Sequence, residues 1–143
     1  MARLDDGHST TLTFAEGPYT FYEKEVTPPG IDGGGPNNTT TMLNTVYRTK
    51  KPKKLKTLTN MSLTVAYDPI FYTDIIGDIN VNQLITITFP DDSTLAVYGW
   101  IDKFTPATIV EGEQPTAEVV IECSNENNAD PPAETAPVYT APA

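Results

Sequence analysis

The feature that most constrains this chain is a series of short segments in which apolar and polar residues alternate, separated by Pro, Gly, Asn and Asp. Alternation with a period of two places successive side chains on opposite faces of a strand. Ile85, Ile87 and Phe89 share one such face. Similar segments, rich in Thr, Val, Ile, Tyr and Phe, occupy residues 9–15, 19–27, 61–67, 83–89, 94–104 and 116–124. The sequence therefore predicts an all-β fold, an antiparallel β-sandwich or barrel of six to seven strands.

Two turn signals and one helix signal organise these strands. Gly17-Pro18 predicts a hairpin within residues 9–27, and Pro90-Asp91-Asp92-Ser93 predicts a second hairpin within residues 83–104. The one convincing helix is expected over residues 69–76. It follows an Asp, which is a good N-cap, begins with a Pro, which is favoured at the first helical position, and precedes a Gly.

Two stretches lack the apolar residues needed to pack into a core. Residues 28–45 are rich in Pro, Gly, Asn and Thr, and a loop of this length is usually functional or disordered. The central Gly33-Gly34-Gly35 run indicates a flexible contact arm. Residues 125–143 form a Pro-rich extended tail. The predicted organisation is one β domain over residues 1–124, followed by this tail.

The charges are separated along the chain. The net charge is −10, from 19 acidic and 9 basic residues, which disfavours general affinity for nucleic acid. Six of the basic residues nevertheless fall within nine positions, namely Arg48, Lys50, Lys51, Lys53, Lys54 and Lys56. The open alternatives for this basic segment are a solvated strand face and an electrostatic contact with an acidic neighbouring subunit.

No enzyme constellation is visible. His8 is the single histidine and is expected in a loose N-terminal arm, with no oxyanion hole or nucleophile turn to complete a hydrolytic triad. Cys123 is the single cysteine and is expected to be an inert buried thiol on the apolar face of its strand. The Gly-rich run within residues 30–35 lacks the following helix and the Lys-Ser/Thr pair of a phosphate-binding loop. We therefore predict no catalytic residue and no cofactor.

One calcium-site pattern is present but incomplete. Residues 78–82 match the opening of an EF-hand loop, which also needs Gly at its sixth position and Glu at its twelfth. Gln83 and Phe89 occupy those positions, so we predict a polar connection between helix and strand and no metal site.

Location signals are equally sparse. No segment approaches the roughly 20 apolar residues of a membrane helix, which predicts no membrane anchor. Residues 1–6 lack the apolar region of a signal peptide. The chain is therefore expected to fold in a cytoplasm.

Five segments carry a family resemblance. They are Thr39-Thr40-Thr41-Met42 at the end of the Gly-rich arm, Tyr67-Asp68-Pro69, Ile85-Thr86-Ile87-Thr88-Phe89-Pro90-Asp91, Gly99-Trp100-Ile101 and Gly112-Glu113-Gln114-Pro115-Thr116-Ala117. In their order, spacing and all-β setting they resemble the major tail tube proteins of long-tailed, siphovirus-like bacteriophages. The resemblance spans about residues 30–124, and the Pro-rich tail lies outside it.

The resemblance implies a structural protein of the virion tail, assembled in the bacterial host cytoplasm. In that family the subunits form hexameric rings, and the rings stack into a tube through which the genome passes. The same fold serves contractile tails and type VI secretion. The implied partners are further copies of the chain, the tape measure protein inside the tube during assembly, and the tail tip and terminator proteins. DNA would pass an acidic channel without specific binding, because like charges repel.

The resemblance and the charge pattern together suggest where copies meet. We expect inter-subunit or inter-ring contacts at Gly33, Gly34, Gly35, Asn37, Thr40, Met42, Arg48, Lys53, Lys54, Lys56, Asp74 and Asp78. In this hypothesis the basic segment docks on the acidic helix of a neighbour. Candidates for the lumen-facing positions are the polar strand residues Thr86, Thr88, Glu118 and Glu122.

Two other readings remain. One is a head-tail joining or tail terminator protein, which forms a single ring. The other is a β-sandwich module of the tail that binds a receptor or carbohydrate through exposed aromatic residues, for which Tyr98, Trp100 and Tyr139 are the candidates. Tyr98 and Trp100 share a strand face in the segment expected to form the core.

Overall fold

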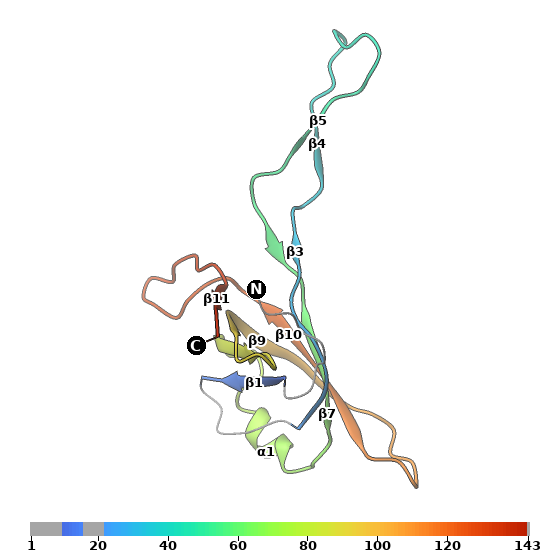
Figure 1. The fold of residues 1–143 in the computed structure, drawn as a ribbon, viewed down its shortest axis with the longest axis vertical. Helices are drawn as coiled ribbons and strands as arrows, with labels where there is room; N and C mark the ends of the chain where they lie inside the picture. Colours follow the sequence, from blue (N-terminus) through green and yellow to red (C-terminus); the bar gives the residue numbers. More distant parts are fainter. Residues whose placement is uncertain (1–9, 16–21, 143) are drawn as a thin grey trace.

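The computed structural model describes residues 10–15 and 22–142 and contains one curled antiparallel sheet with a long arm (Figure 1). The strands of the sheet follow in the spatial order β1 (Thr11–Phe14), β8 (Gln83–Thr88), β9 (Thr94–Pro106), β10 (Thr116–Cys123), β7 (Met61–Ala66) and β2 (Glu23–Thr27). A seventh strand, β11 (Val138–Thr140), pairs with β9. The predicted all-β fold with six to seven antiparallel strands and one short helix is confirmed.

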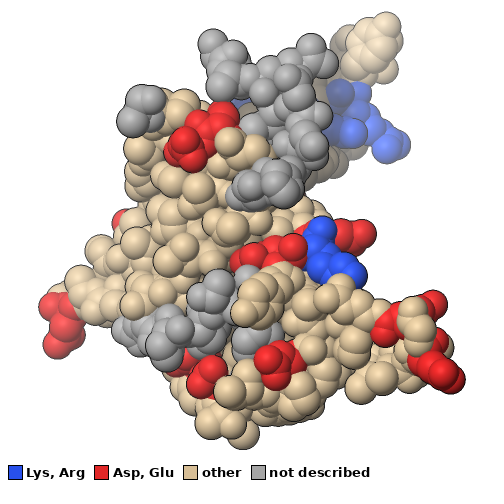
Figure 2. Space-filling model, turned by 60° about the horizontal axis from the view of Figure 1, so that its bottom comes forward, with Lys and Arg blue, Asp and Glu red and all other residues tan. Residues whose placement is uncertain are grey.

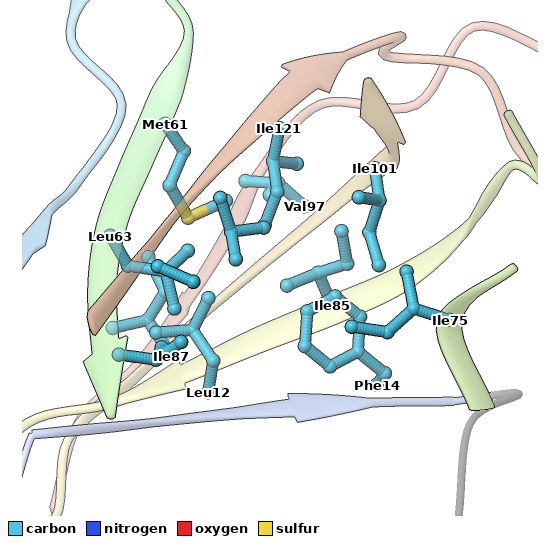
Figure 3. Packing of buried hydrophobic residues seen from close by; sticks show 13 residues of the cluster. Leu12, Phe14, Met61, Leu63, Ile75, Ile85, Ile87, Val97, Ile101 and Ile121 are labelled. Carbon is cyan, nitrogen blue, oxygen red and sulfur yellow. The ribbon is translucent and has the colours of Figure 1, made fainter. Parts of the chain in front are cut away.

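The concave side of the sheet encloses the core (Figure 3). Burial alternates residue by residue along β7, β8 and β10, as the period-two pattern requires. Each fully buried aliphatic side chain contributes roughly 1.5–3 kcal/mol relative to exposure. The buried apolar residues are Leu12, Phe14, Met61, Leu63, Val65, Ile75, Ile85, Ile87, Val97, Ile101, Ala117, Val119 and Ile121.

Strand β9 is long enough to pair with different neighbours at its two ends. Its first half pairs with β8, and its second half pairs with β10. The register shifts within the second half, because Val120 and Ile121 of β10 oppose Lys103 and Ile101, leaving Asp102 as an extra residue. A bulge of this kind bends a strand and increases its twist, which helps the sheet curl.

The hairpin expected within residues 9–27 does not form. Strand β1 pairs with β8 and strand β2 pairs with β7, so the two lie at opposite ends of the strand order. Leu12 and Phe14 of β1 align with Ile87 and Ile85 of β8 and complete the core there. The Gly17-Pro18 turn signal lies outside the described residues.

The hairpin between β8 and β9 forms as predicted. The Phe89 N–H donates to the Ser93 carbonyl oxygen at 2.9 Å, and the Asp91 carboxylate accepts from the Ser93 N–H at 3.0 Å. Asp92 takes the left-handed conformation, with φ +68°, which Asp tolerates in turns.

The short helix α1 (Phe71–Ile75) is preceded by a turn rather than beginning at Pro69. The Asp68 carboxylate accepts from the Ile70 N–H at 3.2 Å, which caps this turn and not the helix itself. Within the described residues, no helix is long and apolar enough to cross a membrane.

Residues 28–60 form a two-stranded arm, whereas residues 28–45 were expected to be a long irregular loop. Strand β3 (Ile31–Asp32) pairs with β6 (Thr57–Leu58), and β4 (Pro36–Asn38) pairs with β5 (Lys50–Pro52). The arm continues the β2–β7 hairpin away from the sheet (Figure 1). The Gly-rich segment and the basic segment are thus the two legs of one arm.

The tail also differs from a purely extended segment, because it returns to the sheet. Strand β10 pairs with β9 only from Gly99 onward, which leaves the β9 edge at Thr94–Ala96 for β11. Asn82 holds the departing chain through its side-chain amide, which donates to the Glu126 carbonyl oxygen at 2.7 Å and to the Asn128 side chain at 2.9 Å.

Candidate assembly surfaces

The arm is a built structure with a defined change of direction. Between β3 and β4, Gly34 and Gly35 have φ angles of +85° and +82°, which are unfavourable for residues with a side chain. The Gly34 N–H donates to the Asp32 carboxylate at 2.8 Å. At the base of the arm, the Gly30 N–H donates to the Thr59 hydroxyl at 2.7 Å. The predicted contact residues Gly34 and Gly35 therefore shape the arm.

The tip of the arm, residues 39–49, is closed by Thr and Asn side chains. The Thr39 N–H donates to the Thr49 carbonyl oxygen at 3.0 Å, and the Thr49 N–H donates to the Thr40 hydroxyl at 3.0 Å. The Asn44 amide donates to the Tyr47 carbonyl oxygen at 2.9 Å and accepts from the Thr41 N–H at 2.9 Å. Asn44 was not among the predicted site residues, although Asn is a common organiser of turns.

Apolar side chains project from this closed tip. Met42 is fully exposed, Leu43 is 90% exposed and Tyr47 is 81% exposed. Together with Val46 and Thr49, Leu43 and Tyr47 line an open hollow of about 510 Å³. Of these residues, sequence reasoning selected only Met42. Apolar side chains gathered on an exposed protrusion are typical of interaction sites, so the tip is a candidate contact surface.

The arm is the basic part of the molecule. Residues 28–60 hold six basic side chains and one acidic side chain, a net +5. The remaining residues hold three basic and 18 acidic side chains, a net −15, which gives the total of −10. Arg48 lies within the tip, directly after Tyr47, and Lys50 directly follows the tip, while Lys53, Lys54 and Lys56 lie along the returning leg.

The opposite end of the molecule carries α1 and the connection between β9 and β10 (Figure 1). Buried Ile75 anchors α1 on the core. The rings of Tyr67, Tyr72 and Phe104 pack against one another, with centroids 5.9–6.3 Å apart. Ile70 and Ile76 face outward and are 61% and 72% exposed.

Acidic residues accompany this exposed apolar surface. Asp68 is exposed, and Asp74 and Asp78 are partly exposed. We call Asp68, Ile70, Tyr72, Asp74, Ile76 and Asp78 the α1 surface. Figure 2, which brings this end forward, shows acidic side chains spread over it, basic atoms at one place among them, and further basic side chains on the distant arm. Asp74 and Asp78, predicted as contact residues, thus lie far from the predicted basic residues of the same chain.

The four residues proposed for the lumen lie on the outer face of the sheet. Thr86 and Thr88 alternate with buried residues of β8, and Glu118 and Glu122 alternate with buried residues of β10. These strands flank β9, so the four share one face of the sheet.

Tyr98 and Trp100 also project from that outer face. They alternate with buried Val97, Gly99 and Ile101, and both are partly exposed. Their expected location in the core is therefore wrong, because the strand lines the core with the other set of residues. Tyr139, on β11, is exposed.

The seam between the two end strands is bridged by one carboxyl group. The Leu12 N–H of β1 donates to the Glu23 Oε1 atom of β2 at 3.2 Å. Burial raises the pKa of the Glu23 carboxyl above its ordinary value of 4.5, against the opposing effect of hydrogen bonds from the backbone N–H groups of Glu23 and Leu12. This residue was not singled out from the sequence, because its role depends on the curling of the sheet.

The candidate metal-binding and reactive residues do not form a site within the described part of the chain. Among residues 10–15 and 22–142, no cluster of three or more His, Cys, Asp or Glu side chains is arranged to hold a metal ion. Cys123 is half-buried rather than fully buried, and this burial raises the pKa of its thiol. His8 lies outside the described residues.

Comparison with solved structures finds chains with the same fold. No protein-family model matches this sequence, and no curated protein matches it. A chain in the six-fold symmetrised baseplate of the anti-feeding prophage superposes with a TM-score of 0.62 at 7% identity, covering 92% of this chain and 91% of that chain. A chain in the extended PVC sheath-tube complex, an extracellular contractile injection system, superposes with a TM-score of 0.60 at 13% identity, covering 92% and 88%. This chain shares their fold.

One similar structure is a prophage baseplate and the other is a contractile injection system, whereas the sequence resemblance was to the tubes of long-tailed phages. At 7% and 13% identity the likeness concerns the fold.

Proposed function

We propose that this protein is a structural subunit of a phage-tail-type tube, which forms rings that stack through the arm. The observation that carries the proposal is the arm itself, a hydrogen-bonded protrusion with exposed apolar residues at its tip and a net charge of +5 on an otherwise acidic molecule. A folded monomer gains no core packing from these exposed side chains. Contact with another copy gives them a partner.

The two ends of the molecule carry different surfaces, and this favours stacking. The arm and the α1 surface lie at opposite ends (Figure 1). A contact between two different surfaces is heterologous, and it continues from copy to copy unless its rotation closes a ring. One such contact, closing at six, makes the ring of the proposed hexamer. A second, along the tube axis, adds rings.

The acidic body suits a conduit for DNA. A wall bearing net negative charge repels the duplex and keeps it from adhering. In this proposal the outer-face residues Thr86, Thr88, Glu118 and Glu122 are the candidates for the channel lining. The tape measure protein, the tail tip and the terminator are the proposed partners, and no residue is assigned a catalytic role.

A second candidate follows from the likeness to a baseplate chain. In that case the chain forms one ring that joins other tail components and does not polymerise. This candidate includes head-tail joining and terminator proteins. A single discrete assembly at every concentration distinguishes it from a tube.

Sedimentation velocity over a range of protein concentrations tests the proposal. A tube subunit is expected to give a continuous series of large species that grows with concentration. The Met42→Ser/Leu43→Ser double variant is expected to reduce that series, because both side chains are exposed and contribute nothing to the monomer core. Wild-type protein that remains monomeric throughout would contradict the proposal.

A further inference from the structure

We infer that the arm tip of one copy docks on the α1 surface of a copy in the next ring. This inference rests on the proposed tube function and names the receptor surface for the arm. The partner bound at the α1 surface is a second copy of this chain, and the contact is made at one end of the molecule.

The arm tip and the α1 surface both expose apolar side chains. The hollow at the tip is open and is lined by Leu43, Val46 and Tyr47. On the α1 surface, Ile70 and Ile76 are aliphatic side chains that project from a firmly anchored element. An aliphatic side chain that packs against these exposed aliphatic and aromatic side chains removes apolar surface of both partners from water.

The two surfaces also carry opposite charges. Arg48 lies in the tip and Lys50 directly follows it, and the α1 surface contains Asp74 and Asp78 besides its exposed isoleucines. In the described part of the chain, neither basic residue forms an ion pair. Opposite charges around an apolar centre fix the register of two surfaces and accelerate their encounter. The basic residues of the tip and the acidic residues of the α1 surface are therefore complementary in charge.

The arm and α1 are also placed so that copies in a row bring them together. The arm extends along the longest axis of the molecule, and α1 lies at the other end (Figure 1). Repeated copies in one orientation therefore bring the tip of each arm toward the α1 end of the next. The competing surface at this end is the β9–β10 connection, where Ile109, Val110, Glu111 and Glu113 are exposed. The tests below separate these two surfaces.

Photo-crosslinking of the full chain tests the contact directly. A photoreactive phenylalanine derivative replaces Met42, which is fully exposed, and crosslinked peptides are identified by mass spectrometry. Mixing with an isotope-labelled copy identifies crosslinks between different chains. We expect intermolecular crosslinks to residues 68–78. Crosslinks to residues 107–115 or to any other surface, or none between chains, would overturn the inference.

Charge exchange tests it independently. Arg48→Glu/Lys50→Glu and Asp74→Lys/Asp78→Lys are each expected to raise the critical concentration for assembly by at least about tenfold, because like charges then face each other. Combining the two pairs is expected to restore most of the loss. Circular dichroism and thermal unfolding check that each variant is folded.

Glu111→Lys/Glu113→Lys is the matched control, since it makes the same charge change on the neighbouring protrusion. It is not expected to rescue Arg48→Glu/Lys50→Glu. If Glu111→Lys/Glu113→Lys restores assembly and Asp74→Lys/Asp78→Lys does not, the β9–β10 connection is the receptor for the arm tip. In that case this inference is wrong, but the proposed tube function still holds. If the wild-type chain forms neither rings nor tubes, the proposed function fails instead.

Discussion

Gly99 shows how strongly a single residue is constrained by its backbone neighbours. It is buried in β9, opposite Cys123 of β10, and a Cβ atom built on it would lie 2.3 Å from the Glu122 carbonyl oxygen. Since that neighbour is backbone, a strand must move to accept a methyl group. We expect Gly99→Ala to lower the free energy of unfolding by about 1–3 kcal/mol, measured by urea denaturation. Gly77→Ala, where the added atom meets nothing within 4 Å, is expected to stay within about 0.5 kcal/mol.

Glu23 makes stability depend on pH in a definable direction. Its pKa is raised in the folded state, so the folded protein holds this proton more tightly than the unfolded chain does. The stability due to the protonated form is complete below the unfolded value of 4.5 and is lost as pH rises through the folded pKa. Glu23→Gln keeps an acceptor for the Leu12 N–H without the charge, and is expected to lose less stability than wild type over this range.

Urea denaturation at several pH values checks this expectation. Glu23→Ala serves as the control, because it removes the acceptor as well as the charge and is expected to be less stable than Glu23→Gln at neutral pH. Equal pH dependence in wild type and Glu23→Gln would show that another group is responsible.

Among the elements, the arm is expected to be dispensable for folding. Its strands β3, β4 and β5 bury no side chain in the core. Asp32 and Thr57 are the last paired residues at its base, so an Asn-Gly turn between them can replace residues 33–56. The shortened chain is expected to unfold with a free energy within about 1 kcal/mol of wild type and to lose assembly. A shortened chain that still forms tubes would show that the arm is not the stacking element.

The returning tail depends on a small polar network. The Ser124 hydroxyl donates to the Asn82 side-chain oxygen at 2.7 Å, and the Asn82 amide holds Glu126 and Asn128. We expect Asn82→Ala to increase hydrogen exchange in β11 and along the β9 edge at residues 94–96, because the tail then leaves that edge more often. Exchange in β7 is expected to stay slow, and a general increase there would instead indicate loss of the whole fold.

Sequence patterns predicted the elements in which one face is buried. Strands β7, β8, β9 and β10 alternate between apolar and polar residues because the core requires it, and all four lie close to their expected positions. The arm and β11 have no buried face, so their sequences show no alternation to detect. The pairing partners of β1 and β2 could not be predicted from the sequence either, because they depend on how the whole sheet curls.

The candidate contact surfaces were only partly visible for the same reason. The basic segment and the Gly-rich run stand out in composition, but their pairing into one arm depends on the β3–β6 and β4–β5 registers. The exposed apolar tip and the exposed face of α1 resemble core segments in the sequence. Only the structure distinguishes an outward-facing Leu43 or Ile76 from a buried residue.

At the scale of the whole molecule, charge and shape point along one axis. A basic arm with an apolar tip lies at one end, and an acidic, partly apolar surface lies at the other (Figures 1 and 2). Copies that associate head to tail build open assemblies, which suits a tube better than a closed dimer.

Electron microscopy of the purified full chain, negatively stained over a range of concentrations, tests this central claim most directly. The account predicts rings with a central channel, stacked into tubes that lengthen as concentration rises. Isolated particles of subunit size at every concentration would contradict it.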